Sequence, residues 1–253
     1  MRRAPPTIAE HWSRLKPHVH CLGPEGVRPT VLLFHSCGGV AAHTHQYAQA
    51  AAALGFRSVV VDSYAPRGWS RAFGLAFVCT GLALWGRERA GDVLAAAWGA
   101  VQDLDADPQR LVLAGWSHGA WSIMDLMTMP LLEPGEAGLA DPSPAPLAGV
   151  RGLFLGYPYG GVGALSRVRP WVRSPRVLGM LAERDHVTRP KDAERCYAAA
   201  AQAGVELEIW RCRASHAFDE THSLLAPMRY DSVLGSEALG RFKAFVRDSL
   251  GSA

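Results

Sequence analysis

The most informative part of the sequence reads Leu111-Val112-Leu113-Ala114-Gly115-Trp116-Ser117-His118-Gly119-Ala120-Trp121. An apolar run ends there in Gly-x-Ser-x-Gly, and a segment of helical composition, 120–129, follows at once. Between a strand and a helix, this pattern places a serine hydroxyl on a sharp, strained turn at the top of a sheet. The sequence therefore predicts Ser117 as a nucleophile, although glycine and serine also occur together in ordinary turns between a strand and a helix.

Short apolar runs alternate with segments of helical composition along the rest of the chain. We expect strands at 18–22, 30–34, 57–61, 111–114, 152–156, 177–182 and 205–210, and helices at 46–54, 87–104, 120–129, 191–203 and 236–250. This alternation is typical of an α/β domain with a mainly parallel central sheet flanked by helices on both faces. In such sheets functional groups lie outside the carboxyl ends of the strands.

Composition limits the class of protein. The chain has 253 residues, 49% hydrophobic and 19% charged, which suits one large domain over 1–253 with a full core. A net charge of +3 with scattered arginines does not favour nucleic acid. The longest uncharged run, 72–86, is shorter than the roughly 20 residues that cross a bilayer, and no secretory signal is evident. We expect a soluble, cytoplasmic protein without nucleic-acid or membrane partners.

The cysteines and histidines show no metal-binding pattern. Five cysteines form no CxxC pair and are odd in number, which favours neither a disulfide framework nor a zinc cluster, and a reduced compartment is the simpler interpretation. Cys79 and Cys196 are expected to be small buried side chains. His18-x-His20 and His43-x-His45 lack a third ligand at metal spacing. We therefore expect no metal and no cofactor.

Two later strand ends supply an acid and a histidine. Asp185 follows the strand at 177–182, and His216 follows the strand at 205–210. The order Ser117, Asp185, His216 is that of the α/β-hydrolases. A serine hydroxyl needs an imidazole to accept its proton, and a carboxylate must orient that imidazole. Glu183 and Asp62 are the rival acids, the latter on the wrong side of the chain order.

An oxyanion hole requires two amide N–H groups aimed at the developing negative oxygen. We expect one from His118, directly after the nucleophile. We expect the second from Cys37, in the loop after the strand at 30–34, where Gly38-Gly39 allow close approach of the backbone. The alternative is a glycine turn that serves only for tight entry into a helix.

Together these motifs resemble the dienelactone hydrolase-like family of the α/β-hydrolase superfamily. The likeness covers about 30–250 and is carried by the segments 32–39, 62–68, 107–110, 115–119, 185–187 and 216–218. It implies an α/β-hydrolase fold, a triad of Ser117, Asp185 and His216, and the same two oxyanion amides. The namesake enzymes have a cysteine as nucleophile, a glutamate where Ser36 stands, and an arginine where this chain has Asp219-Glu220.

The function expected is a serine hydrolase that cleaves a carboxylic ester, lactone or thioester, a small molecule, through an acyl-enzyme. The alternatives are a serine peptidase, an acyltransferase, or a non-catalytic binding module on the same fold. Arg67 is the candidate contact for an anionic substrate, and Trp116 and Tyr157 are candidate pocket residues. At least one of Trp116 and Trp121 is expected to pack beneath the turn.

Three segments stand outside the expected sheet and helices. They are an N-terminal extension at 1–29, a possible flap at 63–86, and a surface excursion at 130–149. The apolar part of the second, 72–86, fits either a flap over the active site or a helix packed in the core. The oligomeric state stays open.

Overall fold

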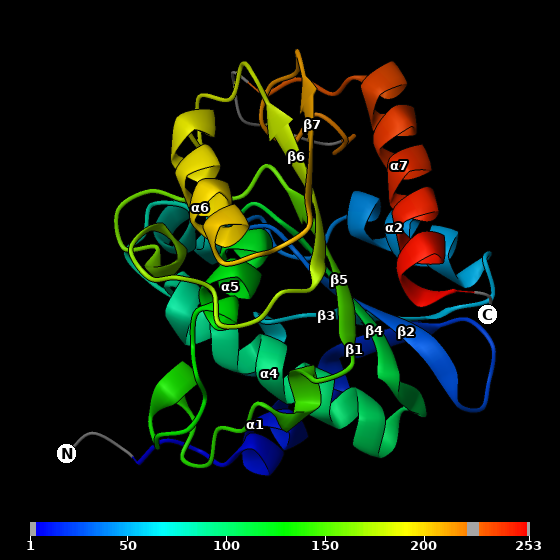
Figure 1. Cartoon of the computed structure of the whole chain (residues 1–253), viewed down its shortest axis with the longest axis vertical. Coiled ribbons are helices and arrows are strands. Elements are labelled where there is room, and N and C mark those ends of the chain that lie inside the picture. The colour runs from blue at the N-terminus through cyan, green and yellow to red at the C-terminus, as the bar shows by residue number, and fades with distance from the viewer. Residues whose placement is uncertain (1–3, 222–227, 252–253) are drawn as a thin grey trace.

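A seven-stranded sheet forms the centre of the computed structural model, which describes residues 4–221 and 228–251 (Figure 1). The spatial order is β1-β3-β2-β4-β5-β6-β7. β1 is antiparallel to β3, and all other neighbours are parallel. The strands are β1 (Val19–Leu22), β2 (Arg28–Phe34), β3 (Arg57–Val61), β4 (Ala106–Trp116), β5 (Val150–Gly156), β6 (Arg176–Ala182) and β7 (Leu207–Cys212). This confirms the predicted fold class.

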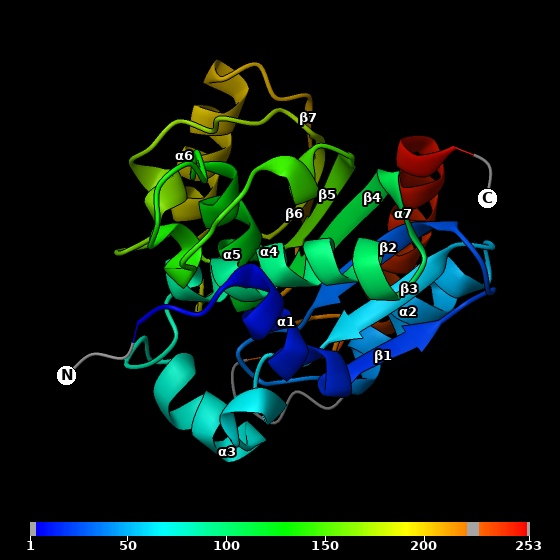
Figure 2. The same ribbon diagram turned by 90° about the horizontal axis from the view of Figure 1, so that it is seen from below.

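Helices cover both faces of the sheet. α2 and α7 lie on one face, and α1, α4, α5 and α6 lie on the other (Figures 1 and 2). Their bounds are α1 (Ile8–Leu15), α2 (Ala42–Ala52), α4 (Gly86–Asp103), α5 (His118–Met127), α6 (Pro190–Gln202) and α7 (Ser232–Leu250).

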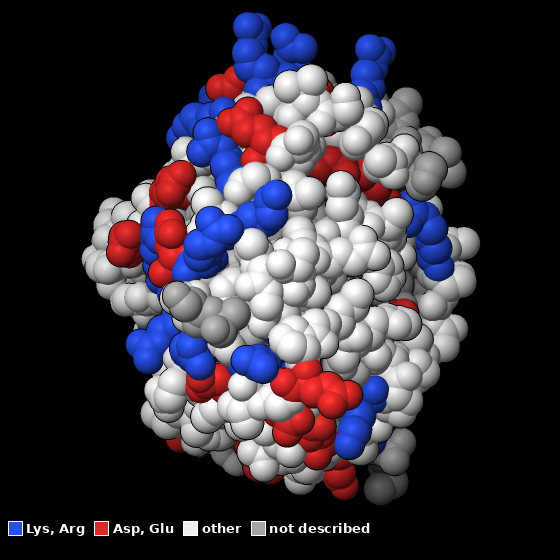
Figure 3. Space-filling model, turned by 90° about the vertical axis from the view of Figure 1, so that its right-hand side faces the viewer, with Lys and Arg blue, Asp and Glu red and all other residues white. Residues whose placement is uncertain are grey.

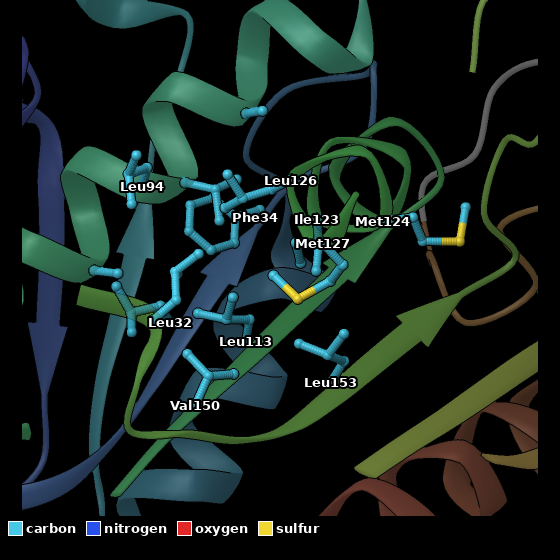
Figure 4. Close-up of a cluster of buried hydrophobic side chains, with 14 of the residues drawn as sticks. Leu32, Phe34, Leu94, Leu113, Ile123, Met124, Leu126, Met127, Val150 and Leu153 are labelled. Atoms are coloured by element: carbon cyan, nitrogen blue, oxygen red, sulfur yellow. The ribbon is translucent and has the colours of Figure 1, made fainter. Parts of the chain in front are cut away.

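The core consists of one apolar cluster on each face of the sheet. Along β4, Leu111 and Leu113 point into the cluster beneath α4 and α5, whereas Val112 and Ala114 point into the cluster beneath α2 and α7. Figure 4 shows part of the first cluster, where β2 and β4 meet α4 and α5. Since both faces of the central strands are buried, these strands read as continuous apolar runs, which made them recognisable in the sequence.

The predicted elements differ from the observed ones mainly at the ends. β4 begins at Ala106, five residues before the predicted start at 111, and Ala106 pairs with Arg28 across a register shift in β2. One whole helix, α1, was not predicted. Thr7 and Glu10 form its capping box, and Trp12 is buried against Gly99 of α4. Part of the predicted N-terminal extension therefore packs on the domain; its first three residues lie outside the described ones.

The predicted flap, 63–86, contains a short helix α3 (Arg71–Phe73) and a π-helical turn (Gly74–Val78). Figure 2 shows α3 standing out from the helix layers. A disulfide joins Cys37 to Cys79 at the end of this turn. The expectation of unpaired cysteines is therefore wrong for these two, because the fold brings together residues 42 positions apart in the sequence. Cys21, Cys196 and Cys212 are free.

The segment 130–149 crosses α4 and carries two short 3-10 turns (Glu136–Gly138 and Ala145–Leu147). Leu131, Leu139 and Leu147 are buried there, so part of this predicted surface excursion packs against the domain.

No helix in the described ranges 4–221 and 228–251 is both long and apolar enough to cross a membrane. Figure 3 shows the side of the molecule that lies to the right in Figure 1, where α2 and α7 are drawn. Basic and acidic side chains both occur there, and neither kind covers the face.

Candidate active site

Ser117 sits on a sharp turn between β4 and α5. Its φ of 51° and ψ of −108° are strained for a residue with a side chain. Two glycines make this turn possible. A Cβ atom on Gly115 would approach the amide nitrogen of Ala120 to 2.7 Å, and one on Gly119 would approach the Phe34 oxygen to 2.2 Å. The sequence pattern thus corresponds to a turn that holds the serine at the carboxyl end of the sheet.

His216 bridges Ser117 and Asp185. Its Nε2 lies 3.0 Å from Ser117 Oγ, and its Nδ1 lies 2.6 Å from Asp185 Oδ2. All three residues are buried. Asp185 follows β6 and His216 follows β7, so the carboxyl ends of three parallel strands bring the three predicted residues together. Of the rival acids, Glu183 is exposed, and Asp62 accepts hydrogen bonds from Tyr64 and Ala65 in its own loop.

The Asp185 carboxylate is held by its own loop. The backbone N–H groups of Val187 and Thr188 each donate to Oδ1 at 2.8 Å, and the Thr188 hydroxyl donates to Oδ2 at 2.8 Å. Oδ2 is also the atom that faces His216. This arrangement fixes the imidazole so that Nδ1 carries the proton and Nε2 can accept one from the serine.

Two backbone amides face the same space. His118 is the first residue of α5, where an N–H group has no partner within its helix. Within the described chain, the N–H of Cys37 donates to no protein acceptor, since the turn after β2 uses the amides of Gly38 and Gly39 instead. Cys37, His118 and Ser117 line one cavity. The geometry can accommodate a negatively charged oxygen between the two amides.

The cavity over Ser117 has a volume of about 280 Å³. The part of its lining that residues 4–221 and 228–251 form has no aspartate, glutamate, lysine or arginine. These lining residues are Cys37, Val78, Cys79, Thr80, Gly81, Trp85, Ser117, His118, Trp121, Tyr159, Val162, Val187 and Thr188. The disulfide and the turn that it anchors form part of the wall. The cavity therefore suits an uncharged group.

Arg67 does not reach this cavity. Its guanidinium binds Asp92 with two hydrogen bonds of 2.9 Å and lines a second cavity on the other side of residues 84–88. Asp92 is fully buried on α4. Burial alone would raise the pKa of Asp92, but Arg67 and His11 together hold that pKa well below its usual range. Arg67 is therefore a counter-ion for a buried carboxylate in this structure.

Trp116 and Tyr157, the other two candidate contacts, lie beneath the site. Trp116 is fully buried and packs on Tyr47. The Tyr157 ring meets the His216 ring edge-on at 4.7 Å, and its hydroxyl donates to Asp219 at 2.8 Å. Tyr157 thus supports the histidine from behind rather than lining the cavity.

Val78 and Trp85 of the cavity wall lie in the segment 72–86, for which a flap over the active site was one of the two predictions, whereas the sequence predicted no role for Val162 and Thr188. Trp121 and Tyr159 also line the cavity, and Tyr159 lies two residues after the candidate contact Tyr157. Thr188 carried a usable signal, because a threonine three residues after an aspartate often hydrogen-bonds that carboxylate in a loop. The others lie on long connections whose path no periodicity reveals.

Comparison of the sequence with family models and with curated proteins gave no match. Solved structures do match. A Klebsiella pneumoniae protein assigned as a dienelactone hydrolase is 15% identical, with a TM-score of 0.65 and coverage of 90% of this chain and 91% of that one. A dienelactone hydrolase-like promiscuous phosphotriesterase from metagenomic libraries is 14% identical, with a TM-score of 0.63 and coverage of 90% and 89%.

A third similar structure is Thermogutta terrifontis esterase 2 phosphorylated by paraoxon, 15% identical, with a TM-score of 0.63 and coverage of 91% of this chain and 88% of that one. At such identities the likeness concerns the arrangement of the backbone. The sheet order, the strained turn at Ser117 and these comparisons lead to one conclusion: the chain has the α/β-hydrolase fold, as found in dienelactone hydrolase-like structures.

Proposed function

We propose that the protein is a serine hydrolase of the dienelactone hydrolase-like type that cleaves uncharged carboxylic esters, lactones or thioesters through an acyl-enzyme on Ser117. The observation that carries this proposal is the continuous hydrogen-bonded series from Ser117 Oγ through His216 to Asp185. Ser117 itself lines a cavity whose described lining residues carry no charge. The esterases and hydrolases among the structures of the same fold support it.

The mechanism follows from the positions of the atoms. Ser117 Oγ attacks the acyl carbon while His216 Nε2 takes its proton, and Asp185 stabilises the imidazolium that forms. The amides of Cys37 and His118 donate to the oxyanion, each contributing about 3 kcal/mol by the magnitude usual for one such donor. His216 then protonates the leaving alkoxide or thiolate and activates water, which releases the acid.

The residues that line the cavity over Ser117 indicate the class of substrate. An anionic acyl group would enter a cavity of about 280 Å³ whose lining has no cation to compensate it, since Arg67 is bound to Asp92 outside it. Removing the hydration of a carboxylate without a partner is costly. Trp85, Trp121 and Tyr159 instead offer apolar surface, and we infer a preference for compact, neutral acyl groups.

The test is hydrolysis of p-nitrophenyl esters from acetate to decanoate by wild type, Ser117→Ala and Ser13→Ala. Ser13 is an exposed serine on α1 and serves as the matched control. We expect Ser117→Ala to lower kcat at least a thousandfold, because removing the nucleophile of a triad costs more than that. Ser13→Ala should match wild type.

Incubation with paraoxon gives an independent measurement. Mass spectrometry should find one diethylphosphoryl group on the peptide that contains Ser117, and none in Ser117→Ala. Ester hydrolysis at wild-type rates by Ser117→Ala, or a label on another residue, would refute the proposal. A short-chain optimum would agree with the cavity volume.

A further inference from the structure

The largest charged side chain with no exposed surface in the described chain belongs to Arg89 of α4, directly beneath the turn at Ser117. Its Nε donates to the Ser63 hydroxyl at 2.9 Å. Its Nη1 donates to the His35 carbonyl at 2.8 Å and lies 3.2 Å from Nδ1 of His118. Its Nη2 is buried and has no hydrogen-bond partner among the residues that the structure describes.

Arg89 makes no ion pair with a carboxylate among the residues at 4–221 and 228–251. Asp92, one turn further along α4, is paired with Arg67 and His11 instead. Burial lowers the pKa of Arg89, which reflects the cost of removing a cation from water. Burying a charged group without an oppositely charged partner is costly. Stability alone is therefore a weak reason for a guanidinium at this position.

Of the three groups that Arg89 contacts, two belong to the segments that carry the Cys37 and His118 amides. The His35 carbonyl lies two residues before Cys37 in the loop after β2, and the His118 imidazole belongs to the residue whose N–H starts α5. A single rigid guanidinium thus connects the backbones that carry both donors.

His118 is arranged to accept from Arg89. Its Nε2 lies 2.6 Å from the Leu84 carbonyl, to which it must donate, so Nδ1 is left as an acceptor. Burial, and then the charge of Arg89, lower the pKa of His118 to about 3. The imidazole is therefore neutral at pH 7, and the Arg89 guanidinium is a cation in contact with the first residue of α5.

We propose that Arg89 is a positioning residue of the oxyanion hole. It keeps the Cys37 and His118 amides at the spacing that the tetrahedral intermediate requires, and its buried charge favours the negative oxygen over the neutral carbonyl oxygen of the substrate. This inference rests on the proposed function. Because the effect appears as charge develops, Arg89 contributes to kcat and little to KM.

The test compares Arg89→Met and Arg89→Lys with wild type and Ser117→Ala. Each variant is assayed for kcat and KM on p-nitrophenyl acetate and for inhibition by an aryl trifluoromethyl ketone, which forms a tetrahedral oxyanion on serine. We expect Arg89→Met to lower kcat about 10²-fold, the loss usual for one oxyanion donor, with KM changed less than threefold. The affinity for the ketone should fall by the same factor as kcat.

The conservative variant keeps the test decisive if Arg89→Met does not fold. Lysine keeps the charge but cannot hold His35 and His118 at once in a fixed geometry. Arg89→Lys should therefore recover part of the activity and show a kcat about tenfold below wild type. A folded Arg89→Met or Arg89→Lys with wild-type kcat and ketone affinity would overturn the proposal.

The failure of the proposed function would look different. In that case Ser117→Ala would retain the wild-type rate, and the ketone would bind wild type no better than it binds Ser117→Ala. Loss of activity in Ser117→Ala together with wild-type kinetics in both Arg89 variants would instead remove only the role of Arg89.

Discussion

Two cavities share residues 84–88 as a wall and differ in their chemistry. The first, of about 280 Å³, contains Ser117 and has no charged residue in the described part of its lining. The second, of about 770 Å³, is lined by four arginines together with His11 and two glutamates. Trp85 faces the first, whereas Leu84, Arg87 and Glu88 face the second. Side chains adjacent in the sequence thus line an uncharged cavity on one side and a cavity rich in charged residues on the other.

The comparison shows where charge is tolerated near the site. The described polar groups that line the first cavity are neutral, so each hydrogen bond to a developing charge there acts in a medium of low dielectric constant. The arginines of the second cavity border solvent, and one of them, Arg67, neutralises the buried Asp92. The following variants test this difference between the two cavities.

Arg67→Met should have the largest effect on stability. It leaves Asp92 fully buried with only His11 beside it, and removing one partner of a buried pair costs about 3–5 kcal/mol. Because Arg67 and His11 lower the folded-state pKa of Asp92, the stabilisation in wild type is fully present above about pH 4 and is lost as the pH falls through the folded-state value. The difference between wild type and variant should shrink in acid.

Urea denaturation at pH 7 and at about pH 2 measures both parts of this prediction, because the stabilisation is lost only below about pH 4. Arg14→Met is the control, since Arg14 is exposed on the same cavity.

In Arg67→Met the ratio of kcat/KM for neutral and anionic esters should stay within about twofold of wild type, because the affected pair lies outside the first cavity. A twofold change corresponds to about 0.4 kcal/mol. Selective loss of the anionic substrate would restore the role expected for Arg67 from the sequence.

Cys79→Ser should have the second-largest effect, a loss of stability. Opening a disulfide that closes a long loop costs about 2–4 kcal/mol, and here the bond also anchors the wall of the first cavity. We expect a lower Tm and a higher KM for short esters. Cys21→Ser, at an exposed free cysteine, is the matched control. An unchanged Tm in Cys79→Ser would mean that the bond does not constrain the unfolded chain.

Trp85→Ala should have the smallest effect and the most specific one. The indole lines the first cavity, its Nε1 donates to the Gly81 carbonyl at 3.0 Å, and the Arg87 guanidinium lies 4.4 Å from its ring centre. Its removal should enlarge the acyl site and shift preference toward longer chains. We expect the kcat/KM ratio of octanoate to acetate to rise about tenfold, or about 1.4 kcal/mol. Trp69→Ala, in the second cavity, should leave this ratio unchanged.

The sequence predicted the sheet well because its central strands are buried on both faces and read as apolar runs. It also predicted that Ser117, Asp185 and His216 would be neighbours, because all three follow strands whose carboxyl ends meet at one edge. The two glycines around Ser117 are required by close backbone approach, which explains why a five-residue pattern carried so much information.

The sequence could not predict which of the two cavities a given side chain would line, because residues 84–88 separate them only in the folded chain. Arg67 is the kind of residue that binds an anionic substrate. Only the position of Asp92 on α4 shows that its guanidinium already binds a carboxylate of the protein. The pairing of Cys37 with Cys79 likewise depends on the path of residues 63–86, which has no periodicity. Their bond also removes the argument for a reducing compartment, since disulfides persist mainly in oxidising ones.

The same bond makes the main chain from 37 to 79 a covalent ring that includes all of α2 and β3. A protease that cuts once inside the ring, for example after the partly exposed Arg71, cannot release either fragment until the bond is reduced. A cut near the exposed Leu82, just beyond the ring, produces two fragments with no covalent link between them. Nicked protein from the two sites would therefore migrate differently on a gel run without reductant.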